Sequence, residues 1–292
     1  MKDIYFLTIS RENTALSTQP HLMLCGENIS FLNPILKNST LIEQSEDFFT
    51  MKVTFFKGSR FSQTLESKVL CSETKLFCNK NQLPECKYPC LGKVVIATEI
   101  KQIDVELIKN ISWFIRGSET LKQESLKELP NEWRIIDGRG MALLEKYPQS
   151  LKQSCRQLFL VMLGLAYYYA LQQINEELSR VLAKSDNTSE LDQLYSDASI
   201  FNASYYFYNP IEFSRYATFR TWQDVREAYH LEQKNKEITS QLAQVHQILS
   251  YTEQKNEQIL DKLRDKKIAW FAGVISALSL FEVIDVIKNW LS

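Results

Sequence analysis

The chain has 292 residues, of which 45% are apolar, and its formal net charge is −1 at pH 7. This length accommodates two domains, or one domain with an extension. The near-neutral charge excludes a general electrostatic attraction to nucleic acid, so no nucleic-acid partner is expected. Only eight glycines are present, which argues against glycine-rich phosphate loops and against an all-β fold with many tight turns.

The first part of the chain, residues 1–135, combines strand and helix patterns. Residues 4–9, 51–56 and 93–98 are short runs rich in β-branched and aromatic side chains, which predict strands. Residues 102–127 instead carry apolar side chains at helical spacing. We therefore expect an α+β domain over residues 1–135. Its first residues contain too short an apolar run for a secretory signal, so we expect this domain to be cytoplasmic.

A helical layer is predicted for residues 136–209, with a polar loop at 183–192. Its most apolar stretch, LFLVMLGLAYYYAL at 158–171, would be about 21 Å long as a helix, which is short for a bilayer. Arg156 and Gln172 border this stretch closely. We expect it to be a buried core helix.

Residues 210–267 are predicted to form a long stalk helix that carries a heptad repeat from Leu231 onward. Leucine at the a positions with β-branched residues at the d positions favours trimers or tetramers over dimers. We therefore expect a homo-oligomer, a trimer or higher. The alternative is that this seam pairs with another helix of the same chain. The a positions are Asn235, Leu242, Leu249, Asn256 and Leu263, and the d positions are Leu231, Ile238, Val245, Thr252 and Ile259.

The last segment, residues 268–290, is predicted to be a C-terminal transmembrane helix. Residues 268–281 carry no charge, and about 20 residues span the hydrocarbon core of a bilayer. Trp270 and Trp290 suit the two interfaces, and the basic residues within 262–267 place that flank in the cytosol. We expect a single-pass protein of the cell inner membrane with a cytoplasmic N-terminal domain. The alternative is a buried terminal helix.

The heptad continues into this last segment and predicts a seam for membrane insertion and self-association. Gly273 and Ala277 are four residues apart, a spacing that lets helices approach closely in lipid. Glu282 and Asp285 fall off the seam, so they line a pore only in a rotated register and otherwise meet headgroups or water. The predicted seam comprises Trp270, Gly273, Ala277, Leu280, Ile284 and Ile287.

Four of the six cysteines lie between residues 71 and 90, at Cys71, Cys78, Cys86 and Cys90. The spacing from Cys86 to Cys90 suits a zinc site, whereas that from Cys71 to Cys78 is wide for one. A zinc site built from all four is one interpretation. Cysteines without a metal are a second, and an iron–sulfur or disulfide arrangement is a third, so the cofactor stays unknown.

Arg226 and His230 form an R-x3-H pair, which is similar to the R-x4–6-H motif of HEPN-type ribonucleases but one residue shorter. The resemblance implies a nuclease site at this pair. The alternative is that both side chains belong to a solvated helix face.

In the order of its parts, the chain resembles CorA-like cation channels, which also join a cytosolic α+β domain through helices to the membrane. Those proteins carry a second membrane helix after a Gly-Met-Asn signature, and this chain has neither. Their ion-selectivity residues therefore have no counterparts here.

These features together predict a non-enzymatic, membrane-anchored oligomeric sensor or effector. Its cytosolic domain would recognise an unknown ligand or protein and act on the membrane through the stalk, as a gated pore or a membrane-disrupting protein in one version. An enzyme, either a nuclease or a zinc-dependent hydrolase, is an alternative in which the last helix is an anchor or part of the core. A non-catalytic scaffold is another.

Overall fold

A computed structural model describes residues 4–12, 23–25, 27–46, 49–73, 90–147, 151–183, 188–212 and 216–291, with side chains except at 27–28, 73, 188, 249, 252–253, 256 and 274–291. The strands are β1 (Ile4–Arg11), β2 (Met23–Leu24), β3 (Glu27–Asn28), β4 (Leu41–Gln44), β5 (Met51–Phe55), β6 (Gln63–Glu73), β7 (Gly92–Ala97), β8 (Lys127–Glu128), β9 (Glu132–Asp137) and β10 (Gly140–Glu145). The helices are α1 (Pro34–Asn38), α2 (Val105–Arg116), α3 (Leu151–Leu182), α4 (Thr188–Ser204), α5 (Tyr216–Ala228) and α6 (Leu231–Leu291), with a short 3-10 helix, η2 (Gln123–Ser125).

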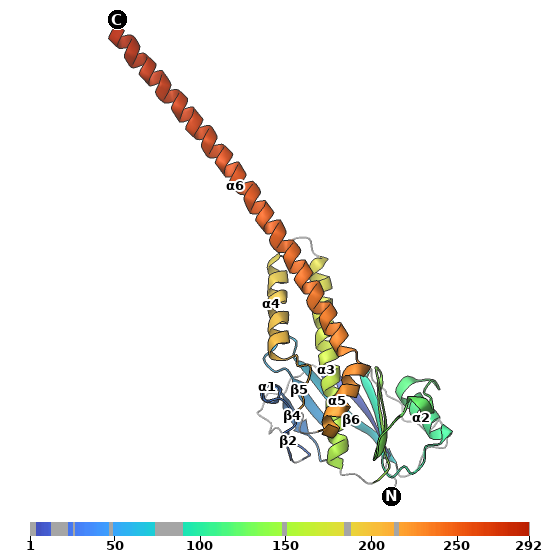
Figure 1. Ribbon diagram of the computed structural model, residues 1–292. Helices are drawn as coiled ribbons and strands as arrows, with labels where there is room; N and C mark the ends of the chain where they lie inside the picture. Colours follow the sequence, from blue (N-terminus) through green and yellow to red (C-terminus); the bar gives the residue numbers. More distant parts are fainter. Residues whose placement is uncertain are drawn as a thin grey trace. The chain divides into compact units, whose positions relative to one another are not determined.

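In the described part of the chain, eight strands form one mixed sheet in the order β4-β5-β6-β1-β7-β10-β9-β8 (Figure 1). Neighbouring strands are antiparallel except β7 and β10, which run parallel. A parallel pair needs a crossover connection, and α2 lies in the segment that joins these two strands. The α+β prediction is therefore confirmed, and β9 and β10 extend the strand-rich part to Glu145.

Helices α2 and α3 cover opposite faces of the sheet. Successive residues of a strand point to opposite faces. Phe6 and Val95 belong to the apolar cluster that includes α2, whereas Leu7, the next residue of β1, is fully buried outside that cluster. On this second face, a Cβ added to Gly92 of β7 would lie 3.4 Å from Leu165 Cδ1 of α3. Each face of the sheet thus has its own helical cover.

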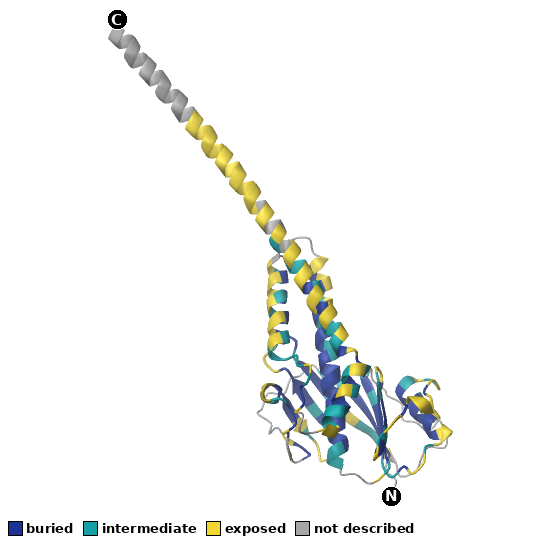
Figure 2. Ribbon diagram, in the orientation of Figure 1, coloured by how far each residue is buried: buried dark blue, intermediate teal, exposed yellow. Residues whose placement is uncertain are grey.

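Helix α3 runs through the centre of the fold, and Figure 2 shows its middle turns as buried. The prediction of a buried core helix at 158–171 is confirmed, because this stretch lies within α3 and most of its side chains are buried. The apolar residues cover the helix all round, as expected for a helix with neighbours on several sides. Near its centre, the Tyr167 hydroxyl donates to the carbonyl oxygen of Tyr205 at 2.7 Å, and burial raises the pKa of Tyr167.

The stalk prediction is wrong in its extent, since residues 210–267 do not form one free helix. Helix α5 ends at Ala228, and His230, with φ +50°, turns the chain before α6 begins. Leu231 and Ile238, two predicted seam positions, are buried. Here the apolar face of α6 is covered by its own domain, as the intramolecular alternative proposed.

The first turns of α6 also make polar contacts with the neighbouring helices. Lys234 Nζ lies 4.1 Å from the ring centre of Tyr168 on α3. Asn202 on α4 donates to the Thr239 hydroxyl at 3.4 Å. The chain divides into two units, residues 1–239 and 240–292, and α6 contributes to both.

The prediction of a C-terminal membrane helix over 268–290 is wrong, and with it the membrane-protein and inner-membrane assignments. Within the residues that the structure describes, no helix is both long enough and apolar enough to cross a membrane. A membrane span needs about 20 apolar residues, and the apolar run of α3 at 158–171 is shorter than that. In α6 polar or charged side chains recur in every turn up to Lys267, and the apolar run that follows among the described side chains, residues 268–273, is only six residues long.

Candidate functional site

The predicted seam residues of α6 do not share one environment. Leu242 is buried and Asn235 is half-buried, whereas Leu263 and Trp270 are exposed. A Cβ added to Gly273 would meet nothing within 4 Å. Several predicted seam positions lie outside the described side chains, and so do the two acids predicted to fall off the seam, Glu282 and Asp285. These seam positions are Leu249, Thr252, Asn256, Ala277, Leu280, Ile284 and Ile287.

The predicted zinc ligands are described only in part. Cys71 lies in β6 and Cys90 comes just before β7, and both are partly exposed. Cys78 and Cys86 lie outside the described residues. Among the residues that are described, no three histidine, cysteine or acidic side chains gather as a metal site would require. A site formed by all four cysteines therefore stays a prediction.

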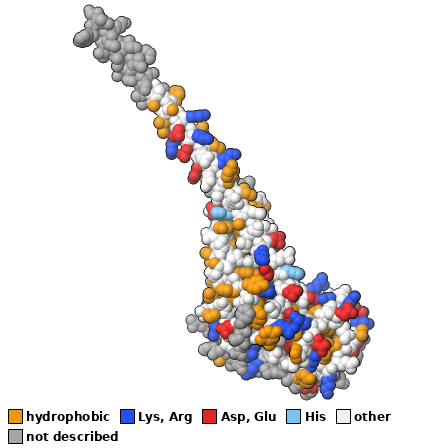
Figure 3. Space-filling view, viewed as in Figure 1, with side chains coloured by type: hydrophobic (Ala, Val, Ile, Leu, Met, Phe, Trp, Pro, Cys, Tyr) orange, Lys and Arg blue, Asp and Glu red, His pale blue; other side chains and the backbone are white. Residues whose placement is uncertain are grey.

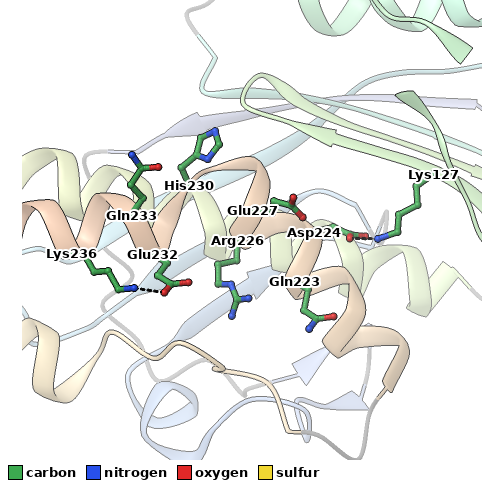
Figure 4. A pocket seen from close by; sticks show the side chains of 9 residues that line it. All are labelled: Lys127, Gln223, Asp224, Arg226, Glu227, His230, Glu232, Gln233 and Lys236. Carbon is green, nitrogen blue, oxygen red and sulfur yellow. Dashed lines mark hydrogen bonds and ion pairs between the residues drawn. The ribbon is translucent and has the colours of Figure 1, made fainter. Parts of the chain in front are cut away.

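Arg226 and His230 border the same cleft, but their side chains point in different directions (Figure 4). The Arg226 guanidinium carbon lies 3.7 Å from the ring centre of Tyr208, in a cation–π contact. His230 occupies the turn between α5 and α6. The two side chains therefore do not converge on one position in this structure, and a nuclease site at this pair stays a prediction.

This cleft, which we call the α5–α6 cleft, is the candidate functional site (Figure 4). Its volume is about 660 Å³, within the range of small-molecule sites. Strand β8, helix α5, the turn after it and the first turns of α6 supply its walls. The lining side chains are Lys127, Gln223, Asp224, Arg226, Glu227, His230, Glu232, Gln233 and Lys236.

Asp224 is the best-connected side chain of the cleft. Its Oδ1 atom lies 2.6 Å from Lys127 Nζ, and its Oδ2 atom lies 2.6 Å from Arg134 Nη2. Arg134 is buried and also lies 3.3 Å from Glu132 Oε1. Charge-assisted hydrogen bonds of this kind compensate for the cost of burying the charges. They join α5 to β8 and β9, and so hold one wall of the cleft in place.

The buried part of this network continues away from the cleft toward α3. Arg134 Nη1 donates to the Thr221 hydroxyl, which itself donates to the carbonyl oxygen of Ala217 at 3.1 Å. Glu132 accepts from Gln157 Nε2 at 3.1 and 3.2 Å. Four segments of the chain therefore meet at one charged cluster: β8, β9, α3 and α5.

The opposite wall of the cleft is more exposed. Glu232, in the first turn of α6, lies 2.6 Å from Lys236 Nζ one turn later. This hydrogen bond lowers the pKa of Glu232 and raises that of Lys236. An acidic residue in the first turn is also favoured by the helix dipole.

The chemistry of the lining favours recognition of a polar ligand. All nine side chains are charged or carry an amide or an imidazole, and none of them is a serine, cysteine or threonine nucleophile. Nη1 of Arg226 is buried and has no hydrogen-bond partner among the described residues.

Sequence reasoning found Arg226 and His230 but missed the network around Asp224. Arg134 and Asp224 are 90 positions apart, and neither residue belongs to a recognisable sequence motif. A salt bridge between such distant residues leaves no spacing signal in a single sequence.

No family model matches the chain, and neither the curated proteins nor the solved structures that were compared with it include a match.

Proposed function

We propose that this chain is a non-enzymatic, self-associating protein. In this proposal three or more copies are joined through residues 240–273 of α6, and the α+β unit recognises a polar ligand through the α5–α6 cleft. One observation supports self-association most directly. Helix α6 continues to Leu291, far beyond its buried first turns, and it exposes apolar side chains at heptad positions.

The exposed positions include two members of the heptad seam. Ile259 at d is 47% exposed and Leu263 at a is 51% exposed. Burying a side chain of this type fully stabilises a protein by roughly 1.5–3 kcal/mol. Figure 3 places apolar side chains among charged ones along the described part of α6. A helix without tertiary contacts is only marginally stable in water, so a partner along this face would stabilise it.

A second copy of the chain is the occupant that this face fits. A heptad seam is self-complementary, because every copy presents the same a and d positions to its neighbours. Leucine at a and isoleucine at d favour more than two strands. Ile248 at g and Leu260 at e are also exposed, and they widen the apolar stripe as the core of a larger bundle requires.

Sedimentation velocity of the full chain tests the proposal. We expect the protein to sediment as a trimer or a larger species. The double substitution Ile259→Asp/Leu263→Asp should shift it to a single chain, because six or more carboxylates would then be buried in two adjacent layers of the bundle. Gln254→Asp/Gln258→Asp adds the same charge at the exposed f and c positions of the same helix and is the matched control.

Two results would contradict the proposal. One is an unmodified chain that sediments as a single copy at every concentration tested. The other is an Ile259→Asp/Leu263→Asp variant that associates as strongly as its control, since the apolar seam would then not be the interface.

A further inference from the structure

Two cysteines outside the predicted zinc cluster lie side by side in the core. Gln44 Nε2, at the end of β4, donates to Cys155 Sγ at 3.3 Å and to Cys25 Sγ at 3.5 Å. The same amide accepts from the backbone N–H of Cys25 through Oε1 at 2.7 Å. Both sulfur atoms are thus gathered around one amide nitrogen.

The pair joins parts of the chain that are remote in sequence. Cys25 follows β2 and has a left-handed backbone, with φ +53°, and Cys155 lies in the first turns of α3. Both side chains are buried, with 6% of Cys25 and 0% of Cys155 exposed. Strands β3 to β10 all lie between them along the chain. A bond between the two sulfurs would close a loop that contains nearly the whole sheet.

We propose that Cys25 and Cys155 form a reversible disulfide, with a small peroxide as the oxidant. The thiolate of one cysteine attacks an oxygen of hydrogen peroxide, the O–O bond breaks, and a sulfenic acid and one water result after proton transfer. The second thiol then attacks the sulfenic sulfur, the S–S bond forms, and a second water leaves. Two thiols are oxidised and one peroxide is reduced to two waters, so atoms and electrons balance.

Local chemistry sets the kind of oxidant that reaches the pair. The hydrogen bond with Cys25 and burial both raise the pKa of Cys155, so the thiolate is scarce at neutral pH. Large or charged reagents cannot reach buried sulfurs without opening of the structure. A small uncharged peroxide enters more easily, and the neighbouring thiol captures the sulfenic acid before further oxidation. We therefore expect slow oxidation that stops at the disulfide.

The expected consequence is a covalent tie between the β2–β3 ribbon and α3. Such a bond lowers the conformational entropy of the unfolded chain, and the effect grows with the length of the closed loop. The oxidised chain should melt at a temperature higher by roughly 5 °C or more, and reduction by dithiothreitol should reverse the shift.

Peptide mapping of the full chain tests this site. The protein is incubated with hydrogen peroxide, its remaining thiols are alkylated in denaturant, and a digest is analysed by mass spectrometry without reduction. We expect a peptide pair linked through Cys25 and Cys155 that disappears on reduction. The variant Cys71→Ser/Cys90→Ser, which alters the two partly exposed cysteines, should still form the link.

Cys155→Ser and Cys25→Ser should each abolish the linked peptides and the rise in melting temperature. Using both variants keeps the test valid if one of them fails to fold. Recovery of sulfinic or sulfonic acids at Cys25 and Cys155 without a link between them would overturn the proposal. Links that join either cysteine only to Cys71 or Cys90 would overturn it as well.

Discussion

Gly164 of α3 and Val225 of α5 are packed so closely that a side chain at residue 164 has no room. A Cβ atom added to Gly164 would lie 2.3 Å from Val225 Cγ1 and 3.2 Å from Tyr229 Cδ2. Both neighbours are buried, so neither can turn away into solvent. This close approach sets the position of α5, and α5 carries Asp224 and Arg226 of the α5–α6 cleft.

The substitution Gly164→Ala is expected to destabilise the protein by about 1–3 kcal/mol, because the added methyl group overpacks the α3–α5 contact. Alanine would otherwise favour a helix by about 1 kcal/mol over glycine, so the sign of the change is diagnostic. Urea unfolding measures it. Gly138→Ala is the control, since a Cβ there meets nothing within 4 Å.

A double-mutant cycle locates the origin of this loss. Val225→Ala removes the methyl group that lies nearest to the added Cβ, so Gly164→Ala should cost less in that background than alone. If Gly164→Ala lowers the free energy of unfolding equally with and without Val225→Ala, the clash with Val225 does not set the α3–α5 distance.

Asp224 has two cationic partners that differ in burial, and this difference predicts different costs on their removal. Arg134→Met should destabilise the protein by about 3–5 kcal/mol, because Glu132 and Asp224 would lose their buried partner. Lys127→Met should cost at most about 1 kcal/mol, since exposed ion pairs contribute little. Arg134 has 2% of its side chain exposed and Lys127 has 45%, although each lies 2.6 Å from Asp224.

Chemical denaturation of both variants separates these outcomes. If Arg134→Met and Lys127→Met lower the free energy of unfolding by similar amounts, solvent screens the buried Arg134–Asp224 pair as much as the exposed Lys127–Asp224 pair. The variant Glu132→Gln/Arg134→Met should recover part of the loss, because it removes the buried negative charge of Glu132, which Arg134 neutralises, whereas Asp224 keeps its ion pair with Lys127.

Tyr206 predicts a loss of stability at alkaline pH. Burial, followed by the charge of Glu232, raises the pKa of Tyr206 from 10.0 to about 12. The unfolded chain therefore ionises first, and stability that is fully present below pH 10 is lost as the pH rises toward 12. Burial also raises the pKa of Tyr229, which adds to the loss in the same direction.

Urea midpoints measured between pH 8 and the alkaline limit check this prediction. Tyr206→Phe should make the decline shallower, because a phenyl ring has no proton to lose. Tyr147→Phe, at an exposed site, is the control and should leave the decline unchanged. If the urea midpoint falls equally with rising pH in Tyr206→Phe and Tyr147→Phe, Tyr206 does not contribute to the pH dependence.

Local patterns along the chain predicted several elements, because the spacing of apolar side chains reflects which face of a strand or helix is buried. The β-branched runs at 4–9, 51–56 and 93–98 correspond to β1, β5 and β7, and the apolar stretch at 158–171 corresponds to the buried part of α3. The break before α6 was missed. It lies at His230, which adopts a left-handed conformation without the glycine or proline that normally marks such a turn.

The sequence by itself determined the α+β class, the core helix and the heptad spacing of α6, since each depends on the periodicity of neighbouring residues. Only the tertiary structure decided which partners these elements meet. It buried the first seam positions of α6 in the domain, brought Asp224 to Arg134, and gathered Cys25 and Cys155 around Gln44. Such contacts join residues far apart in the chain, and their formation depends on how the sheet and helices pack together rather than on any local pattern.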